Sequence, residues 1–156
     1  MTADGKAGQM ETFATDQKGV FGINFYPSGP NPKWVYVGNT ASVVRFPYQV
    51  GDMKARGPGE TLTELPGGGG HRTRDIVFTP DGKHMLVSVG SHSNVDDPDT
   101  TPAEFHRADV LEFTPEGEEL ELHLNLLRHG RRTCHARRPE GGDCAFVRMC
   151  PSAFKV

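Results

Sequence analysis

The chain has no cysteine in its first 126 residues, and no apolar run approaches the roughly 18 residues that a membrane-spanning helix needs. No export signal is expected after Met1, because polar residues stand where such a signal has an apolar core. These absences predict no membrane span and no disulfide framework in residues 1–126. They leave the localisation open.

Positive charge is scarce as well, since 17 Lys and Arg stand against 20 Asp and Glu among 156 residues. A net charge of -3 argues against a nucleic-acid partner, and the length suits one domain. What the chain does have is turn formers, with 19 Gly and 12 Pro. Short β-branched runs between turn signals favour an all-β domain.

Charge and cysteine are unevenly distributed. Residues 1–126 hold 10 Lys and Arg against 18 Asp and Glu, whereas residues 127–156 hold 7 against 2. The three cysteines, Cys134, Cys144 and Cys150, all lie in the second segment. Such a shift indicates two regions of different character. We therefore divide the chain into a body at 10–126 and a basic, cysteine-containing tail at 127–156.

An internal repeat organises the body. The pattern Ile-x-Phe-x-Pro occurs at 23–27 and again 53 residues later, and Val-x-Val-Gly occurs at 35–38 and again 52 residues later. A third pair of segments, 43–46 and 110–113, is 67 residues apart. The larger third offset predicts an insertion at about 92–107, between the second and third strands of the second unit.

Each repeat unit is predicted to contain four short strands. They are expected at 21–26, 34–38, 42–48 and 60–65, and at 73–79, 84–90, 108–114 and 119–126. A four-stranded unit of about 52 residues is the size of a β-propeller blade. The predicted fold is therefore all-β, a β-propeller fragment of about two four-stranded blades, with one small β-sandwich or barrel as the alternative. Two blades leave their outer faces uncovered, so the chain is expected to be a fragment or to associate, for instance as copies that close a ring.

Several motifs resemble the glucose/sorbosone dehydrogenase family. They are Gly67-Gly68-Gly69-Gly70-His71-Arg72-Thr73-Arg74-Asp75, Phe78-Thr79-Pro80-Asp81-Gly82 and Val87-Ser88-Val89-Gly90-Ser91-His92-Ser93-Asn94-Val95. Further likeness lies at 17–22, 37–48 and 102–113. The resemblance covers about residues 10–122. It implies a six-bladed propeller, soluble or periplasmic, that uses pyrroloquinoline quinone (PQQ) and Ca²⁺ to oxidise a sugar or aldehyde.

The resemblance also implies roles for three residues. His71 matches the family's general base, Gln17 a polar position beside that base, and Asn94 a loop that lines the same cleft. An imidazole changes protonation near neutrality, which suits a base. Glycines ahead of His71 allow close approach of a flat ligand. Arg72 departs from the family, which has an aromatic residue there, and the family's cofactor contacts are missing after Leu124.

Other candidate sites have plainer explanations. His84 and His92 are expected to be exposed. The acidic loop with Asn94, Asp96, Asp97 and Asp99 lacks the spacing of an EF-hand, so a solvated loop is favoured over calcium and no metal ligand is assigned.

Residues 127–156 fit no blade pattern, and three interpretations stay open. The first is a zinc site of Cys134, Cys144 and Cys150 with His129 or His135, whose spacing is not that of a zinc knuckle. The second is a basic tail that contacts nucleic acid or a membrane surface. The third, which we favour, is a change of reading frame that leaves a sequence unrelated to the body.

The predicted function is that of a truncated PQQ-dependent sugar or aldehyde dehydrogenase, inactive as this chain alone because half of the cofactor site is absent. The alternative is a non-catalytic propeller module that binds a sugar or a protein. The expected partner is a sugar or aldehyde substrate, with no nucleic acid and no membrane span.

Overall fold

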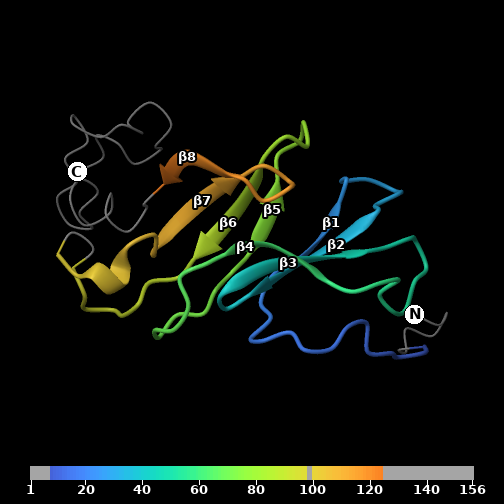
Figure 1. The fold of residues 1–156 in the computed structure, drawn as a ribbon, viewed down its shortest axis with the longest axis horizontal. Helices are drawn as coiled ribbons and strands as arrows, with labels where there is room; N and C mark the ends of the chain where they lie inside the picture. The colour runs from blue at the N-terminus through green and yellow to red at the C-terminus, as the bar shows by residue number, and fades with distance from the viewer. Residues whose placement is uncertain (1–7, 98–99, 125–156) are drawn as a thin grey trace, which may run out of the picture.

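The computed structural model describes residues 8–97 and 100–124 and folds them into two four-stranded antiparallel sheets (Figure 1). Each sheet is a simple meander, with strands in chain order. The first sheet contains β1 (Ile23–Tyr26), β2 (Trp34–Asn39), β3 (Ser42–Pro47) and β4 (Glu60–Glu64). The second contains β5 (Ile76–Phe78), β6 (Met85–Val89), β7 (Asp109–Phe113) and β8 (Glu119–Leu124).

All eight predicted strands are present, and the all-β fold class is confirmed. The largest difference at a strand start is at β5, which begins at Ile76 rather than at residue 73. The residues before it serve the contact between sheets, since the carbonyl of Arg74 accepts a hydrogen bond from the Gly22 amide at 3.2 Å. The predicted insertion is also confirmed, because residues 90–108 separate β6 from β7 and contain the 3₁₀ turn η1 (Pro102–Glu104).

The hydrogen-bonded pairing of the strands matches residues of the first repeat to residues of the second in a different register from the one that the sequence likeness suggests. Val35 pairs with Phe25 and Phe46 in the first sheet, and Met85 pairs with Phe78 and Phe113 in the second. Val35 therefore corresponds to Met85, two residues earlier than the likeness of the Val-x-Val-Gly segments suggests. A shift of two residues keeps every side chain on the same face, so the sequence pattern alone does not detect it.

The main core lies between the two sheets. Tyr36 from β2 and Phe78 from β5 meet edge to face, with ring centroids 4.9 Å apart. Tyr36 is fully buried, and its hydroxyl donates to the carbonyl of Pro115 at 2.8 Å. The buried members of this core are Tyr36, Val43, Leu65, Ile76, Phe78, Met85, Val87, Val89, Leu111 and Phe113. Burial of these side chains supplies most of the attraction between the sheets.

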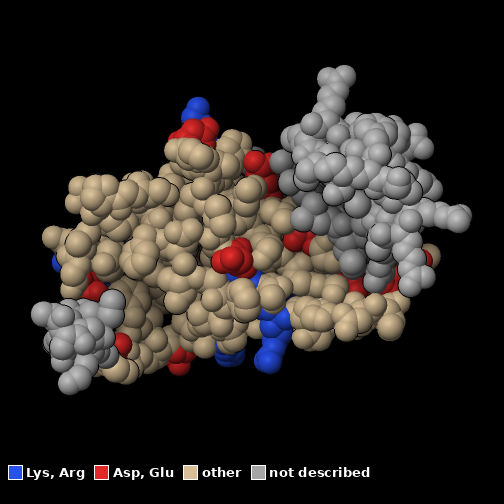
Figure 2. Space-filling model, turned by 180° about the vertical axis from the view of Figure 1, so that it is seen from behind, with Lys and Arg blue, Asp and Glu red and all other residues tan. Residues whose placement is uncertain are grey.

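The first sheet has a second apolar face, which points away from the second sheet. Val35, Val37, Val44 and Phe46 form its buried part, under Phe13, Ala14, Tyr48 and Ala55. Near β1, Ile23 is 58 % exposed and Phe21 is 57 % exposed. Seen from behind in Figure 2, the described part carries its charged side chains at scattered points, with uncharged surface between them. An uncovered apolar sheet face of this kind is expected of a propeller blade without its neighbour.

Within residues 8–97 and 100–124, no helix is long and apolar enough to cross a membrane.

Candidate functional site

His71 lies in the segment between β4 and β5, and its ring is held by one residue of the next hairpin. Nδ1 of His71 lies 2.7 Å from Oγ of Ser91 and 3.2 Å from the carbonyl oxygen of Ser91. The His71 amide donates to the same carbonyl at 3.3 Å. The side chain is half-buried, so part of its surface stays accessible. With a proton on Nδ1 donated to Ser91, the lone pair of Nε2 would be available to a substrate.

The four glycines before His71 are exposed. Glycine is needed in this segment for its backbone conformation and for the close approach of neighbouring side chains. Gly68 and Gly69 adopt φ values of +74° and +75°, in the left-handed region that favours glycine. A Cβ on Gly69 would also lie 2.9 Å from Nη2 of Arg107. On the opposite side, a Cβ on Gly90 would lie 2.8 Å from the Cβ of His71. Glycine at these positions lets three chain segments meet around His71.

Two arginines that the sequence analysis did not single out are buried beside this segment. Arg74 and Arg107 are 0 % and 1 % exposed, and both donate to the carbonyl of Pro66. Burial, together with the charge of Arg107, lowers the pKa of Arg74 to about 10. Burial likewise lowers the pKa of Arg107, while Glu104 acts in the opposite direction. Arginine side chains are ordinarily exposed to solvent, so nothing in the sequence distinguished either residue.

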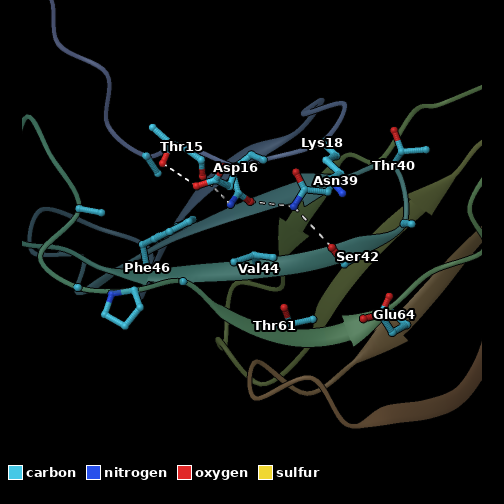
Figure 3. A pocket seen from close by; sticks show the side chains of 17 residues that line it. Thr15, Asp16, Lys18, Asn39, Thr40, Ser42, Val44, Phe46, Thr61 and Glu64 are labelled. Atoms are coloured by element: carbon cyan, nitrogen blue, oxygen red, sulfur yellow. Dashed lines mark hydrogen bonds between the residues drawn. The ribbon is translucent and has the colours of Figure 1, made fainter.

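Gln17 lies at the corresponding end of the first sheet. Its side-chain oxygen accepts a hydrogen bond from Nδ2 of Asn39, the last residue of β2, at 2.8 Å (Figure 3). Gln17 and His71 thus occupy similar places, each in the segment before the first strand of its sheet and each bonded to a residue at the end of the second strand or just after it.

A cavity of about 800 Å³ opens beside Gln17 on the outer face of the first sheet (Figure 3). Its floor includes Val44 and Phe46, and Thr61 and Glu64 project from β4 at its border. The side-chain oxygen of Asn39 is buried at this cavity with no hydrogen-bond partner in the described part of the chain. His71 is not among the lining residues. The structure therefore does not place His71 and Gln17 in one cavity.

Asn94 lies in the exposed loop after β6. Two residues earlier in this loop, the backbone amide of His92 donates to the carboxylate of Glu104. Nδ1 of His92 lies 2.8 Å from Oδ2 of Asp96. His84 is also partnered, with Nδ1 2.7 Å from Oε1 of Glu112. The expectation that His84 and His92 are exposed is only partly right. Both side chains are about two-fifths exposed, and each has a carboxylate partner that strand pairing or the loop fold brings near.

Among the side chains that the structure describes, in residues 8–97 and 100–118, no group of three or more His, Cys, Asp or Glu is arranged to hold a metal ion. Asp99 and the cysteines Cys134, Cys144 and Cys150 lie outside the described residues.

Comparisons with known proteins give two different kinds of likeness. No protein-family model matches the chain. In sequence it is 30 % identical over 135 residues to Endonuclease III of Treponema pallidum, which covers 82 % of this chain and 59 % of that protein. It is 33 % identical over 54 residues to Endonuclease III of Synechocystis, covering 35 % of this chain. It is 34 % identical over 56 residues to Endonuclease III homolog 2, chloroplastic, of Arabidopsis thaliana, covering 36 %. The chain spans 59 %, 24 % and 14 % of these relatives.

In structure the chain is similar to the holo form of the pyranose dehydrogenase PQQ domain from Coprinopsis cinerea, with a TM-score of 0.61 and 22 % identity. The match covers 73 % of this chain and 27 % of that chain. The first sequence match covers 82 % of this chain and the structural match 73 %, while the other two sequence matches cover about a third of it. At this identity the likeness concerns the fold. The two sheets of this chain have the fold of part of a propeller PQQ domain.

Proposed function

We propose that the two sheets are part of a quinoprotein dehydrogenase that oxidises a sugar or an aldehyde, with His71 as its general base. The contact between His71 and Ser91 carries the proposal. A proton on Nδ1 donated to Ser91 leaves Nε2 free to take the proton of a substrate hydroxyl. The adjacent C–H bond then breaks with transfer of its hydrogen and electron pair to an acceptor, and the hydroxyl carbon becomes a carbonyl. General base catalysis of this kind typically contributes about 10² to 10⁴ in rate.

The surroundings of His71 fit a flat, anionic cofactor. Gly68, Gly69 and Gly70 are exposed and present backbone without side chains, and Arg72 is an exposed cation next to the base. These residues would hold PQQ by backbone approach and by charge. When bound, PQQ supplies the acceptor for the hydride. The glucose/sorbosone dehydrogenase family, which the sequence resembles, has an aromatic residue at the position of Arg72. The proposal therefore includes no aromatic stacking on the substrate at this position.

Calcium does not fit the described part of the chain in the same way. The carboxylate of Asp96 pairs with the His92 ring and that of Glu104 accepts from the His92 amide, and no three acidic or histidine side chains converge among those described. The proposal therefore gives Ca²⁺ no role among these residues, and no step depends on it.

The direct test is titration of PQQ into the isotopically labelled chain, followed by NMR. We expect shifts at the His71 ring and at the amides of Gly68, Gly69 and Gly70, with the His84 ring unmoved as an internal control. NMR detects millimolar binding, so the test does not depend on turnover. If the His71 signals do not shift even when PQQ is added up to its solubility limit, the proposal is contradicted.

The curated relatives favour a second candidate function, contact with nucleic acid through the tail at 127–156. These relatives are called endonucleases, and the tail has 7 Lys and Arg against 2 Asp and Glu. Basic residues bind phosphates with affinity that falls steeply with salt. Fluorescence anisotropy with labelled duplex DNA should show salt-dependent binding by the full chain and a loss of at least tenfold after removal of residues 127–156. Equal binding by both forms would exclude the tail.

A further inference from the structure

Arg107 binds the backbone on both sides of the His71 contact. It is the residue at the end of the insertion, and it is 1 % exposed. Its guanidinium makes five hydrogen bonds to carbonyl oxygens. They run from Nε to Gly90 at 3.1 Å, from Nη1 to Pro66 at 3.1 Å and Gly67 at 3.0 Å, and from Nη2 to His71 at 3.1 Å and Ser91 at 3.3 Å.

These carbonyls belong to two segments that are distant in the sequence. Pro66, Gly67 and His71 precede β5, while Gly90 and Ser91 follow β6. One guanidinium thus joins the backbone of His71 to the backbone of Ser91. The carbonyl of Ser91 that accepts from Nη2 is also the one 3.2 Å from Nδ1 of His71. Arg107 therefore binds one of the two Ser91 atoms that contact the imidazole.

Glu104 completes the arrangement from the same insertion. Its carboxylate is 1 % exposed and accepts from the amides of His92 at 2.9 Å and Ser93 at 3.1 Å. Its carbonyl accepts from the Arg107 amide at 3.0 Å. Glu104 thus binds the chain just after Ser91, while Arg107 binds Ser91 itself.

The backbone around Arg107 adopts conformations that non-glycine residues seldom take. His106 has φ 55° and Ala108 has φ 52°, both in the left-handed region. Such conformations persist only where surrounding contacts compensate for them. The five hydrogen bonds of Arg107 supply such contacts, which indicates that the insertion is folded around this side chain.

We propose that Arg107, supported by Glu104, is a positioning residue for His71. It holds the Ser91 carbonyl so that the imidazole keeps its proton on Nδ1 and leaves Nε2 available. The planar fork of arginine matches several carbonyls at once, which the ammonium of lysine does not. The inference rests on the proposed role of His71 as a base, but its test does not require turnover.

Arg74 provides a matched control, because it is a buried arginine like Arg107 but its hydrogen bonds go to other carbonyls than those of His71 and Ser91. It is equally buried, and it donates to the carbonyls of Pro66 and Thr73, both at 2.6 Å. Within the described part of the chain, neither of these hydrogen bonds reaches His71 or Ser91. A purely structural role for buried arginines would make Arg74 and Arg107 equivalent in their effect on the imidazole.

The experiment measures the tautomer ratio of His71 by long-range ¹H–¹⁵N NMR of the full chain, at a pH where the ring is neutral. We expect Arg107→Lys to reduce the ratio of the Nδ1–H to the Nε2–H form at least fivefold, and Glu104→Gln to reduce it by a smaller factor. Arg74→Lys should leave the ratio unchanged even where it lowers the melting temperature.

Far-UV circular dichroism verifies that each variant is folded, and Glu104→Gln keeps the test usable if Arg107→Lys does not fold. An unchanged ratio in the folded Arg107 variant, or an equal change in Arg74→Lys, would overturn the proposal. If His71 fails to respond to PQQ while Arg107→Lys still changes its tautomer, the proposed function fails and the positioning role stands.

Discussion

The hydroxyl of Ser91 lies 2.7 Å from Nδ1 of His71, although 19 residues separate the two in the chain. The pairing of β5 with β6 brings their flanking segments together, and the insertion after β6 then holds both segments in place. A half-buried histidine held on one nitrogen is compatible with the role of general base proposed above.

Loss of the Ser91 hydroxyl should loosen this arrangement. In Ser91→Ala the imidazole keeps only the longer contact to the carbonyl, so we expect the ratio of the Nδ1–H to the Nε2–H form to fall about fivefold, the equivalent of one hydrogen bond of ~1 kcal/mol. The measurement is the same tautomer spectrum. Ser88→Ala is the control, because the Ser88 hydroxyl accepts from the Asp75 amide instead. Identical spectra for Ser91→Ala and the unaltered chain would show that the hydroxyl has no influence.

The chain alone should show no dehydrogenase turnover. It covers 27 % of the propeller domain that it resembles, and loss of groups that position substrate and cofactor costs orders of magnitude in rate. The assay supplies PQQ, Ca²⁺, a dye acceptor and several aldoses to the purified chain. Dye reduction that depends on both PQQ and sugar would refute this prediction and would strengthen the assignment of the activity.

Sugar binding distinguishes catalysis from a binding module without catalysis. If His71 is the base, titration with glucose in the presence of PQQ should shift the His71 ring. If the module binds sugar at the cavity beside Gln17, the side-chain amides of Gln17 and Asn39 should shift instead. We expect the first pattern. The second pattern, unaffected by His71→Ala, would favour the non-catalytic alternative.

The core between the sheets should dominate stability. Phe113 is 1 % exposed in this core, so Phe113→Ala should lower the free energy of unfolding by about 3–5 kcal/mol. Val77 is 52 % exposed on β5, and Val77→Ala should cost within about 0.5 kcal/mol. Urea denaturation measures both. Similar losses for the two variants would mean that the sheets do not pack against each other as described.

Alkaline pH should weaken the fold through Tyr36. Burial raises the pKa of this phenol above its ordinary value of 10.0, so the folded state keeps a proton that the unfolded state releases. The contribution of Tyr36 to stability is therefore full below about pH 10 and is lost as the pH rises through the raised pKa of the folded state.

The measurement is urea denaturation of the chain and of Tyr36→Phe between pH 9 and pH 11.5. Tyr36→Phe should lose stability less steeply with pH, whereas Tyr48→Phe keeps the Tyr36 phenol and should follow the unaltered chain. Parallel curves for all three proteins would contradict the assignment to Tyr36.

The sequence by itself determined the strands, the repeat and the insertion. Alternating apolar residues such as those of 35–37 and 85–89 specify which face of a strand is buried, and turn residues separate the strands. Its resemblance to the glucose/sorbosone dehydrogenase family, together with a glycine-rich context, also pointed to His71. These features are local, so they can be recognised without knowledge of what packs where.

Only the tertiary structure decided the register and the surroundings of His71. Val35 and Met85 correspond because each is paired with equivalent residues of the strands on either side. A shift of two residues leaves the alternation of side chains along a strand unchanged, so the sequence pattern does not reveal it. Arg107 is distant from His71 in the chain, and its burial becomes visible only when five carbonyls from two segments converge on it. Hydrogen bonds between distant segments depend on how the whole chain folds, so no spacing in the sequence predicts them.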